Sequence, residues 1–113
     1  MAIGGATLAD LGPVEVRIGT IIEARTNPRA RKPALVLRID LGPLGVRTSS
    51  AQITDLYEPE QLVGKQVACV CNLEPVRIAG VRSEVLTLGA HREDGAVTLV
   101  TVDHPCPDGT VLA

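Results

Sequence analysis

The sequence predicts an all-β fold with one short helix, and three observations support this prediction. Apolar and polar residues alternate with a period of two over several segments, Gly, Pro and Asp punctuate these segments, and only one segment departs from the strand pattern. The chain has 113 residues, of which 45% are hydrophobic and 1% aromatic, so Tyr57 is the only aromatic side chain. We therefore expect one domain, residues 1–113, with a core of Val, Ile, Leu and Ala.

The first half of the chain predicts three strands. The longest runs from Val14 to Arg25, and its apolar face comprises Val14, Val16, Ile18, Thr20, Ile22 and Ala24. After a break at residues 26–28, a second strand carries Leu35, Leu37, Ile39 and Leu41 on one face. Gly42-Pro43 and Gly45 then turn the chain into a third strand at about residues 44–51.

The second half predicts a helix followed by further strands. Pro59 suits the first turn of a helix and Gly64 its end, so a short helix is expected within residues 54–64. Residues 66–73 are apolar on both faces, which is typical of a central strand. Turns at Ala79-Gly80 and Asp94-Gly95 precede strands at 81–88 and 97–102. This order predicts a five-stranded OB barrel with the helix between the third and fourth strands, an N-terminal arm (1–13) and a C-terminal extension (103–113).

Charge and cysteine content restrict the function classes. Lys and Arg number 11 against 13 Asp and Glu, giving a net charge of −2, unlike a typical basic nucleic-acid binder. Cys69, Cys71 and Cys106 lack paired CxxC spacing, and no nucleophile has a recognisable His and carboxylate partner. We expect Cys69 and Cys71 to pack as small hydrophobic residues, and we expect no metal, no cofactor and no catalysis. The absence of a leader and of a long apolar run predicts a cytoplasmic protein with reduced thiols.

Basic residues concentrate early in the chain. Seven of the 11 lie between residues 15 and 47, a span with only three acidic residues. Arg29, Arg31 and Lys32 fall in the loop that joins the first two predicted strands, where OB folds receive ligands. Phosphate binding is one interpretation, because guanidinium groups pair well with phosphate oxygens. A solvated loop that keeps the protein in solution is the other.

Short motifs follow one another in a fixed order along residues 14–109: Val16–Gly19, Arg31–Ala34, Ser49–Thr54, Leu62–Lys65, Asn72-Leu73 with Pro75, Ile78–Gly80 and Ser83–Leu86. Taken together, they resemble the stand-alone tRNA-binding domain family, and within it the CsaA-type export-related chaperones. The resemblance implies an OB fold, a homodimer, and binding of tRNA elbows or unfolded polypeptide, with a link to preprotein export. The two terminal segments are then expected in the dimer interface.

The resemblance also implies a second group of RNA-binding residues around the Ala79-Gly80 turn. Ser83 and Leu86 match family positions that shape a small pocket, Arg77 would reach a phosphate, and Glu84 would orient a neighbouring arginine. The group comprises Asn72, Arg77, Arg82, Ser83, Glu84 and Leu86. Alternatively, Asn72 and Ser83 only satisfy backbone groups at the rim of the barrel.

A peptide-binding surface is predicted over the same strands, where the chain departs from the family pattern. Leu73 replaces a common Phe, and Glu74 and Val76 interrupt a stretch that is basic in many members. A single aromatic residue limits base stacking, whereas aliphatic pockets beside a strand edge suit an extended polypeptide. The predicted peptide-binding residues are Leu73, Glu74, Val76, Ile78, Val81 and Glu84, the alternative being that they form core or dimer interface.

Two functions are therefore predicted. The favoured one is a CsaA-like chaperone that binds unfolded or export-bound polypeptides as a homodimer and retains tRNA binding. The alternative is a dedicated, structure-specific tRNA-binding protein. The net negative charge and the position of Glu74 favour the first.

Overall fold

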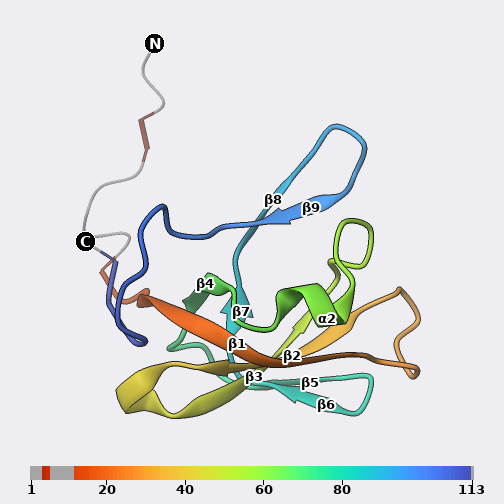
Figure 1. Cartoon of the computed structure of the whole chain (residues 1–113), viewed down its shortest axis with the longest axis horizontal. Helices are drawn as coiled ribbons and strands as arrows, with labels where there is room; N and C mark the ends of the chain where they lie inside the picture. The colour runs from red at the N-terminus through yellow and green to blue at the C-terminus, as the bar shows by residue number, and fades with distance from the viewer. Residues whose placement is uncertain (1–3, 6–11, 113) are drawn as a thin grey trace.

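The computed structural model describes residues 4–5 and 12–112 of the chain (Figure 1). Its elements are β1 (Val16–Thr26), β2 (Leu35–Asp40), the 3₁₀ helix η1 (Gly42–Leu44), β3 (Val46–Ala51), α2 (Pro59–Leu62), β4 (Gln66–Val70), β5 (Val76–Ile78), β6 (Val81–Ser83), β7 (Leu86–Thr87), β8 (Gly89–His91) and β9 (Val97–Leu99). The predicted α-helix is found between the third and fourth strands. It begins at Pro59, and Gly64 follows it with a φ of 94°.

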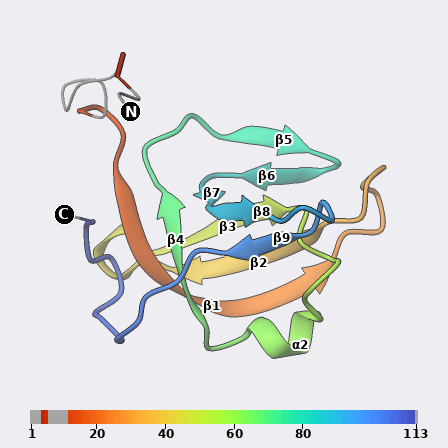
Figure 2. The ribbon, with the colours of Figure 1, turned by 90° about the horizontal axis from the view of Figure 1, so that it is seen from above.

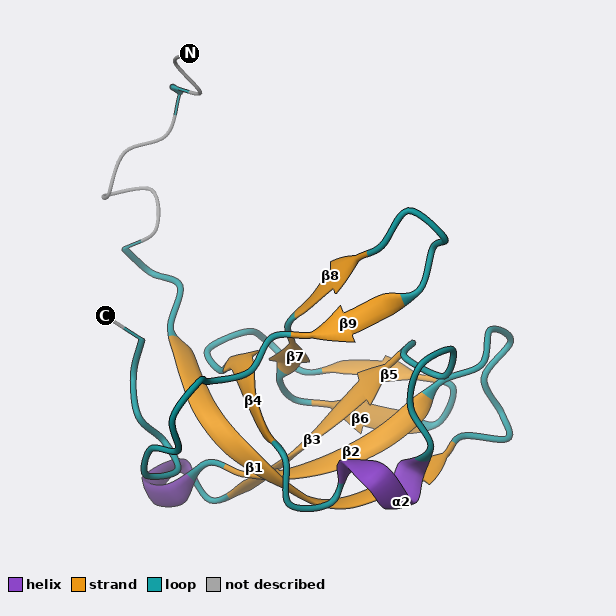
Figure 3. Cartoon of the chain, turned by 45° about the horizontal axis from the view of Figure 1, so that its top comes forward, coloured by secondary structure: helices purple, strands orange, loops and turns teal. Residues whose placement is uncertain are grey.

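Five strands form one antiparallel sheet in the order β3-β2-β1-β4-β7, which curls on itself (Figure 2). The curled sheet brings β7 back to β3, where the Thr87 hydroxyl donates a hydrogen bond to Ser49 Oγ at 2.8 Å. The β5–β6 and β8–β9 hairpins lie outside this sheet (Figure 3). The prediction of an OB-type barrel with five main strands is confirmed.

Side chains complete the closure where β7 is too short to pair with β3. The Thr48 amide donates to Glu84 Oε1 at 3.1 Å, and the Ser50 amide donates to Ser83 Oγ at 3.0 Å. In return, the Glu84 amide donates to the Thr48 carbonyl at 2.7 Å. The prediction of one strand over residues 81–88 is therefore wrong, because the chain breaks at Glu84 and Val85 to make these contacts.

A β-bulge changes the predicted face of the first strand. The pairing of β1 with β2 shifts register between Ile21 and Glu23, and an extra residue in a strand moves later side chains to the other face. As a result Ile21 is fully buried, whereas Ile22 is 46% exposed. The assignment of Ile22 to the buried face was wrong.

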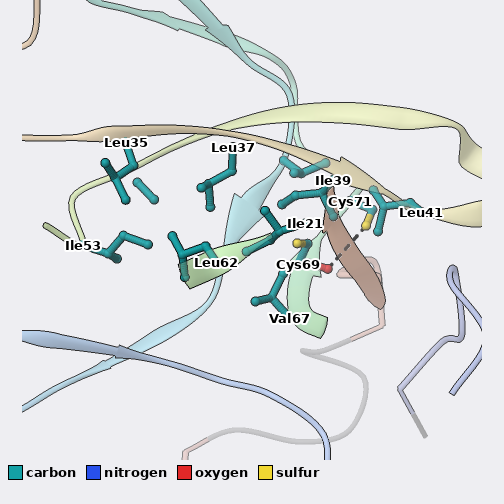
Figure 4. Packing of buried hydrophobic residues seen from close by; sticks show 12 residues of the cluster. Ile21, Leu35, Leu37, Ile39, Leu41, Ile53, Leu62, Val67, Cys69 and Cys71 are labelled. Carbon is teal, nitrogen blue, oxygen red and sulfur yellow. Dashed lines mark hydrogen bonds between the residues drawn. The ribbon is translucent and has the colours of Figure 1, made fainter. Parts of the chain in front are cut away.

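The core lies inside the barrel and consists of aliphatic side chains with two cysteines (Figure 4). Alternate residues of β2 and its end, namely Leu35, Leu37, Ile39 and Leu41, are buried as predicted. Burial raises the pKa of Cys69 to about 12 and also raises the pKa of Cys71. Both thiols are thus uncharged at neutral pH, and their prediction as small hydrophobic core residues is confirmed.

The C-terminal segment lies along the first half of β1 (Figure 3). The Gly109 amide donates to the Ile18 carbonyl at 2.7 Å, the Ile18 amide donates to Thr110 at 2.9 Å, and the Leu112 amide donates to Val16 at 3.0 Å. The predicted N-terminal arm, residues 1–13, falls largely outside the described residues. No helix within residues 4–5 and 12–112 has the length and apolar character that spanning a membrane requires.

Thiol labelling tests the placement of the cysteines. Cys106 is only half-buried, whereas Cys69 and Cys71 lie in the core with raised pKa values and little reactive thiolate. Iodoacetamide at pH 8 should therefore add one label per native chain and three in urea, as measured by intact mass. Rapid triple labelling of the native protein would contradict this placement.

Candidate functional site

Three hollows meet on one side of the barrel, and Ser50 of β3 lines all of them. The first, of about 530 Å³, lies between residues 50–55 and β7–β8. The second, of about 470 Å³, lies beneath the loop between β1 and β2 and is called the loop hollow. The third, of about 180 Å³, lies between the β5–β6 hairpin and β7 and is called the apolar hollow.

The apolar hollow collects most of the predicted peptide-binding residues. Leu73, Val76, Ile78 and Leu86 line it with 48%, 58%, 41% and 50% of their surfaces exposed. Glu74 and Glu84 also line it; Glu74 is exposed, whereas Glu84 is half-buried and its carboxylate accepts the Thr48 amide. Val81 is the exception, because it lines a separate hollow on the outer face of the sheet. Exposed aliphatic side chains beside two carboxylates can accept an apolar segment that also carries a cation.

The loop hollow collects the predicted basic residues Arg29, Arg31 and Lys32, all three of which are exposed. No carboxylate of residues 4–5 or 12–112 lies within 4.0 Å of a nitrogen in their side chains. Three cations without an acidic partner can bind a phosphate group, because charge-assisted hydrogen bonds to phosphate are strong.

A buried asparagine ties this loop to the β5–β6 hairpin. Asn27 Oδ1 accepts the Arg29 amide at 3.1 Å, and Asn27 Nδ2 donates to the Ala79 carbonyl at 3.4 Å. Gly80 follows with a φ of 83°, and a Cβ at this position would lie 2.3 Å from Nη1 of Arg29. The positive φ therefore favours glycine at this turn, whereas the guanidinium is the far end of a flexible, exposed side chain that can shift away from a Cβ.

Asn72, Ser83 and Glu84 all satisfy backbone groups. Asn72 Oδ1 accepts the Glu15 amide at 2.9 Å, and Asn72 Nδ2 donates to the Pro13 carbonyl. Ser83 and Glu84 accept amides of β3 and also line the apolar hollow with Leu86. The contacts thus show the backbone role for Asn72, and for the half-buried Ser83 and Glu84 they combine this role with a place in the wall of the apolar hollow.

Arg77 and Arg82 lie opposite each other on the β5–β6 hairpin and therefore share one of its faces. Arg77 Nη1 donates to the Gly80 carbonyl at 3.4 Å. Arg82 lines a hollow on the outer face of the sheet and does not line the apolar hollow. The hairpin turn therefore separates Arg82 from the three cations of the loop.

The structure adds residues that the sequence did not single out. Ser50 and Gln52 line the loop hollow, and the motif that contains them, Ser49–Thr54, was the signal that could have identified them. Other cations have local partners: Arg17 donates to the Gly109 carbonyl at 2.9 Å, and Arg47 donates to Leu44 at 3.1 Å. These two arginines anchor loops, and they line none of the three hollows.

Comparisons with known proteins agree with this geometry. The family model described as "Putative tRNA binding domain" matches residues 16–111. The methionine–tRNA ligase of Methanocaldococcus jannaschii is 39% identical over 100 residues, which cover 88% of this chain and 15% of that ligase. The chain spans 13% to 15% of the length of the first curated relatives that it matches.

Solved structures match over nearly the whole chain. The chaperone CsaA of Bacillus anthracis strain Ames superimposes with a TM-score of 0.92 and 44% identity, covering 97% of this chain and 100% of that one. The CsaA chaperone protein of Picrophilus torridus gives a TM-score of 0.90 and 39% identity, covering 96% of this chain and 100% of that one. Since the family model covers most of the sequence and the barrel agrees with it, the chain belongs to the tRNA-binding domain family.

Proposed function

We propose that this protein is a CsaA-like chaperone that binds unfolded or export-bound polypeptides without catalysis. The observation that carries the proposal is the apolar hollow, where four aliphatic side chains stand exposed beside Glu74 and Glu84. An extended segment would place an apolar side chain in the hollow and a Lys or Arg near the carboxylates. We also propose residues 1–113 as one domain that acts in the cytoplasm, where free thiols stay reduced.

Binding of tRNA is the second function, and the loop hollow favours it. Arg29, Arg31 and Lys32 would contact phosphates of a folded RNA by charge and shape. The family of the chain supports this function as well. A dedicated tRNA-binding protein remains the alternative to a chaperone that retains tRNA binding. The relative affinities for tRNA and for peptide distinguish the two functions.

We propose a homodimer whose interface includes the C-terminal extension. Val111 and Leu112 are 51% and 46% exposed although main-chain hydrogen bonds hold them beside β1, and Val14 nearby in the chain is 46% exposed. An ordered apolar strip at a sheet edge suits a two-fold interface, which is the commonest arrangement of small soluble oligomers.

A charge reversal at Glu74 should have opposite effects on peptide binding and on tRNA binding. Glu74→Lys should weaken binding of Lys/Arg-rich peptides and strengthen tRNA binding at low salt, each by about two- to fivefold. Both effects should shrink as the Debye length falls from about 30 Å to about 8 Å. Fluorescence anisotropy with labelled peptide and labelled tRNA measures both.

Glu60→Lys is the matched control, because Glu60 is exposed on α2 and the change in net charge is the same. Figure 2 shows α2 and the β5–β6 hairpin on opposite sides of β1–β3. Equal effects of the two variants would exclude a local role of Glu74. Sub-micromolar tRNA affinity of the wild type in physiological salt, with no peptide binding, would favour the dedicated tRNA-binding function instead.

The basic loop is tested by the salt dependence of tRNA binding. Replacing Arg29, Arg31 and Lys32 together by Ala should flatten the slope of log K against log salt by about two to three. Lys65→Ala serves as the control, since Lys65 is exposed next to the end of α2. A triple variant with the slope of the wild type would exclude the loop from RNA binding.

The dimer is tested by light scattering at micromolar concentration. Val111→Asp with Leu112→Asp should lower the measured mass from two chains to one, because buried carboxylates without partners oppose association. Val63→Asp is the control, since Val63 is 53% exposed at the end of α2. A monomeric wild type would overturn the homodimer, and an unchanged double variant would place the interface elsewhere.

A further inference from the structure

The largest of the three hollows lies where the closure of the barrel ends. Its volume is about 530 Å³, and its walls are residues 50–55 on one side and β7–β8 on the other. Beyond the hydrogen bond between Thr87 and Ser49, the β8–β9 hairpin leaves the barrel sheet and stands away from β3 (Figure 3). We call this space the edge hollow, because one edge of β8 borders it.

The edge of β8 that faces the hollow has unpaired main-chain groups. Leu88 accepts an amide of the returning chain and Arg92 donates to it, so residues 88, 90 and 92 point to β9. Gly89 and His91 therefore point away from β9, and both line the edge hollow, whereas Ala90 does not. Neither of the two has a main-chain hydrogen-bond partner within the part of the chain that the structure describes. Two amides and two carbonyls are thus free for another strand.

The sequence of β8 lacks the features that protect an edge strand. Lys, Pro and β-bulges commonly keep other chains from pairing with an exposed edge. In contrast, β8 reads Gly89-Ala90-His91, is exposed throughout and pairs with β9 without a register shift. A Cβ at Gly89 would lie 2.4 Å from Cγ1 of Val97, so close packing leaves this position without a side chain. The edge is therefore open to an added strand.

The side chains of the edge hollow favour polypeptide over nucleic acid. Ile53, Leu88 and Val97 provide an apolar lining, and Ile53 is only 5% exposed. The charges of Lys32 and Asp55 balance each other, so the hollow has no excess of positive charge to attract phosphates when histidine is neutral. An extended polypeptide offers alternate amides and carbonyls to a strand edge and alternate side chains to an apolar lining.

We propose that the edge of β8 pairs with an extended segment of polypeptide, which forms an added strand in the edge hollow. This inference rests on the proposed polypeptide binding and deepens it, because Ser50 and Leu86 line both the edge hollow and the apolar hollow. A bound chain places one apolar side chain in the apolar hollow and continues along β8. Pairing through main-chain groups requires no particular sequence, which suits ligands that share only an extended, unfolded state.

Backbone methylation of a peptide tests the added strand on the wild-type protein. The probe is a labelled peptide of alternating Val and Thr with a Lys at each end, and fluorescence anisotropy measures its affinity. Amides of alternate residues point to the same edge of a strand, so methylating either the Val amides or the Thr amides blocks one edge only. One methylated peptide should bind about tenfold more weakly than the other, because only one edge faces β8. Equal affinities of the two peptides would overturn the added strand.

A proline in β8 tests the same edge from the side of the protein. His91→Pro removes a free amide and keeps the pairing with β9, since the His91 amide points away from β9. The variant should bind the unmethylated peptide about three- to tenfold more weakly than His91→Ala, which loses the same side chain and keeps the amide. Equal binding by the two variants would count against β8 as the paired edge.

The remaining outcomes separate this inference from the proposed function. A wild type that binds no peptide would overturn polypeptide binding and the added strand together. Peptide binding that weakens in Glu74→Lys but not in His91→Pro would overturn the added strand alone. A fall in the light-scattering mass from two chains to one in His91→Pro, but not in His91→Ala, would assign the edge to a second copy of the chain instead of a polypeptide ligand.

Discussion

Hydrogen bonds along one edge of β3 hold the barrel closed, and the walls of the hollows around Ser50 depend on them. The amides of Thr48 and Ser50 would be unpaired on this edge, and the carboxylate of Glu84 and the hydroxyl of Ser83 accept them. Each such bond contributes about 1 kcal/mol, and an unpaired buried amide costs about 1–3 kcal/mol. Because Ser83 ends β6 and Glu84 follows it directly, the same bonds hold the β5–β6 hairpin against the barrel. The apolar hollow and the hollow on the outer face of the sheet both have walls formed by this hairpin.

The surface combines two chemistries that would oppose each other if they overlapped. Carboxylates of Glu74 and Glu84 border the apolar hollow, whereas Arg29, Arg31 and Lys32 border the loop hollow. Ser50 and Ile78 line both hollows and thus mark their shared boundary. Cationic and anionic groups are therefore attracted to different ends of this surface. Because of this separation, a chain with a net charge of −2 still has a locally positive hollow.

Local patterns were sufficient for most of the fold. The alternation of Leu35, Leu37 and Ile39, the position of Pro59 and the Ala79-Gly80 turn each have a short-range physical cause, and each was predicted correctly. The bulge at Ile22 was missed because the extra residue is defined by pairing with β2, and alternation in β1 alone does not reveal it. The break at Glu84 was missed because its partner, Thr48, is 36 residues away in the sequence. For the same reason Arg25, Arg38 and Arg82 were not recognised as a group, since strand register alone brings them together.

Asn27 joins two segments that lie far apart in the sequence. Its side chain accepts the amide of Arg29 in the basic loop and donates to the carbonyl of Ala79 in the hairpin turn. A ligand that displaces the loop must stretch or break this link, and a ligand that draws the hairpin toward the apolar hollow acts on the same link from the other side. If filling one hollow shifts this link, the free energy of filling the other changes as well, and by thermodynamic linkage the effect is equal in both directions. A single buried amide group thus connects the loop hollow to the hairpin that forms a wall of the apolar hollow, with no separate domain between them.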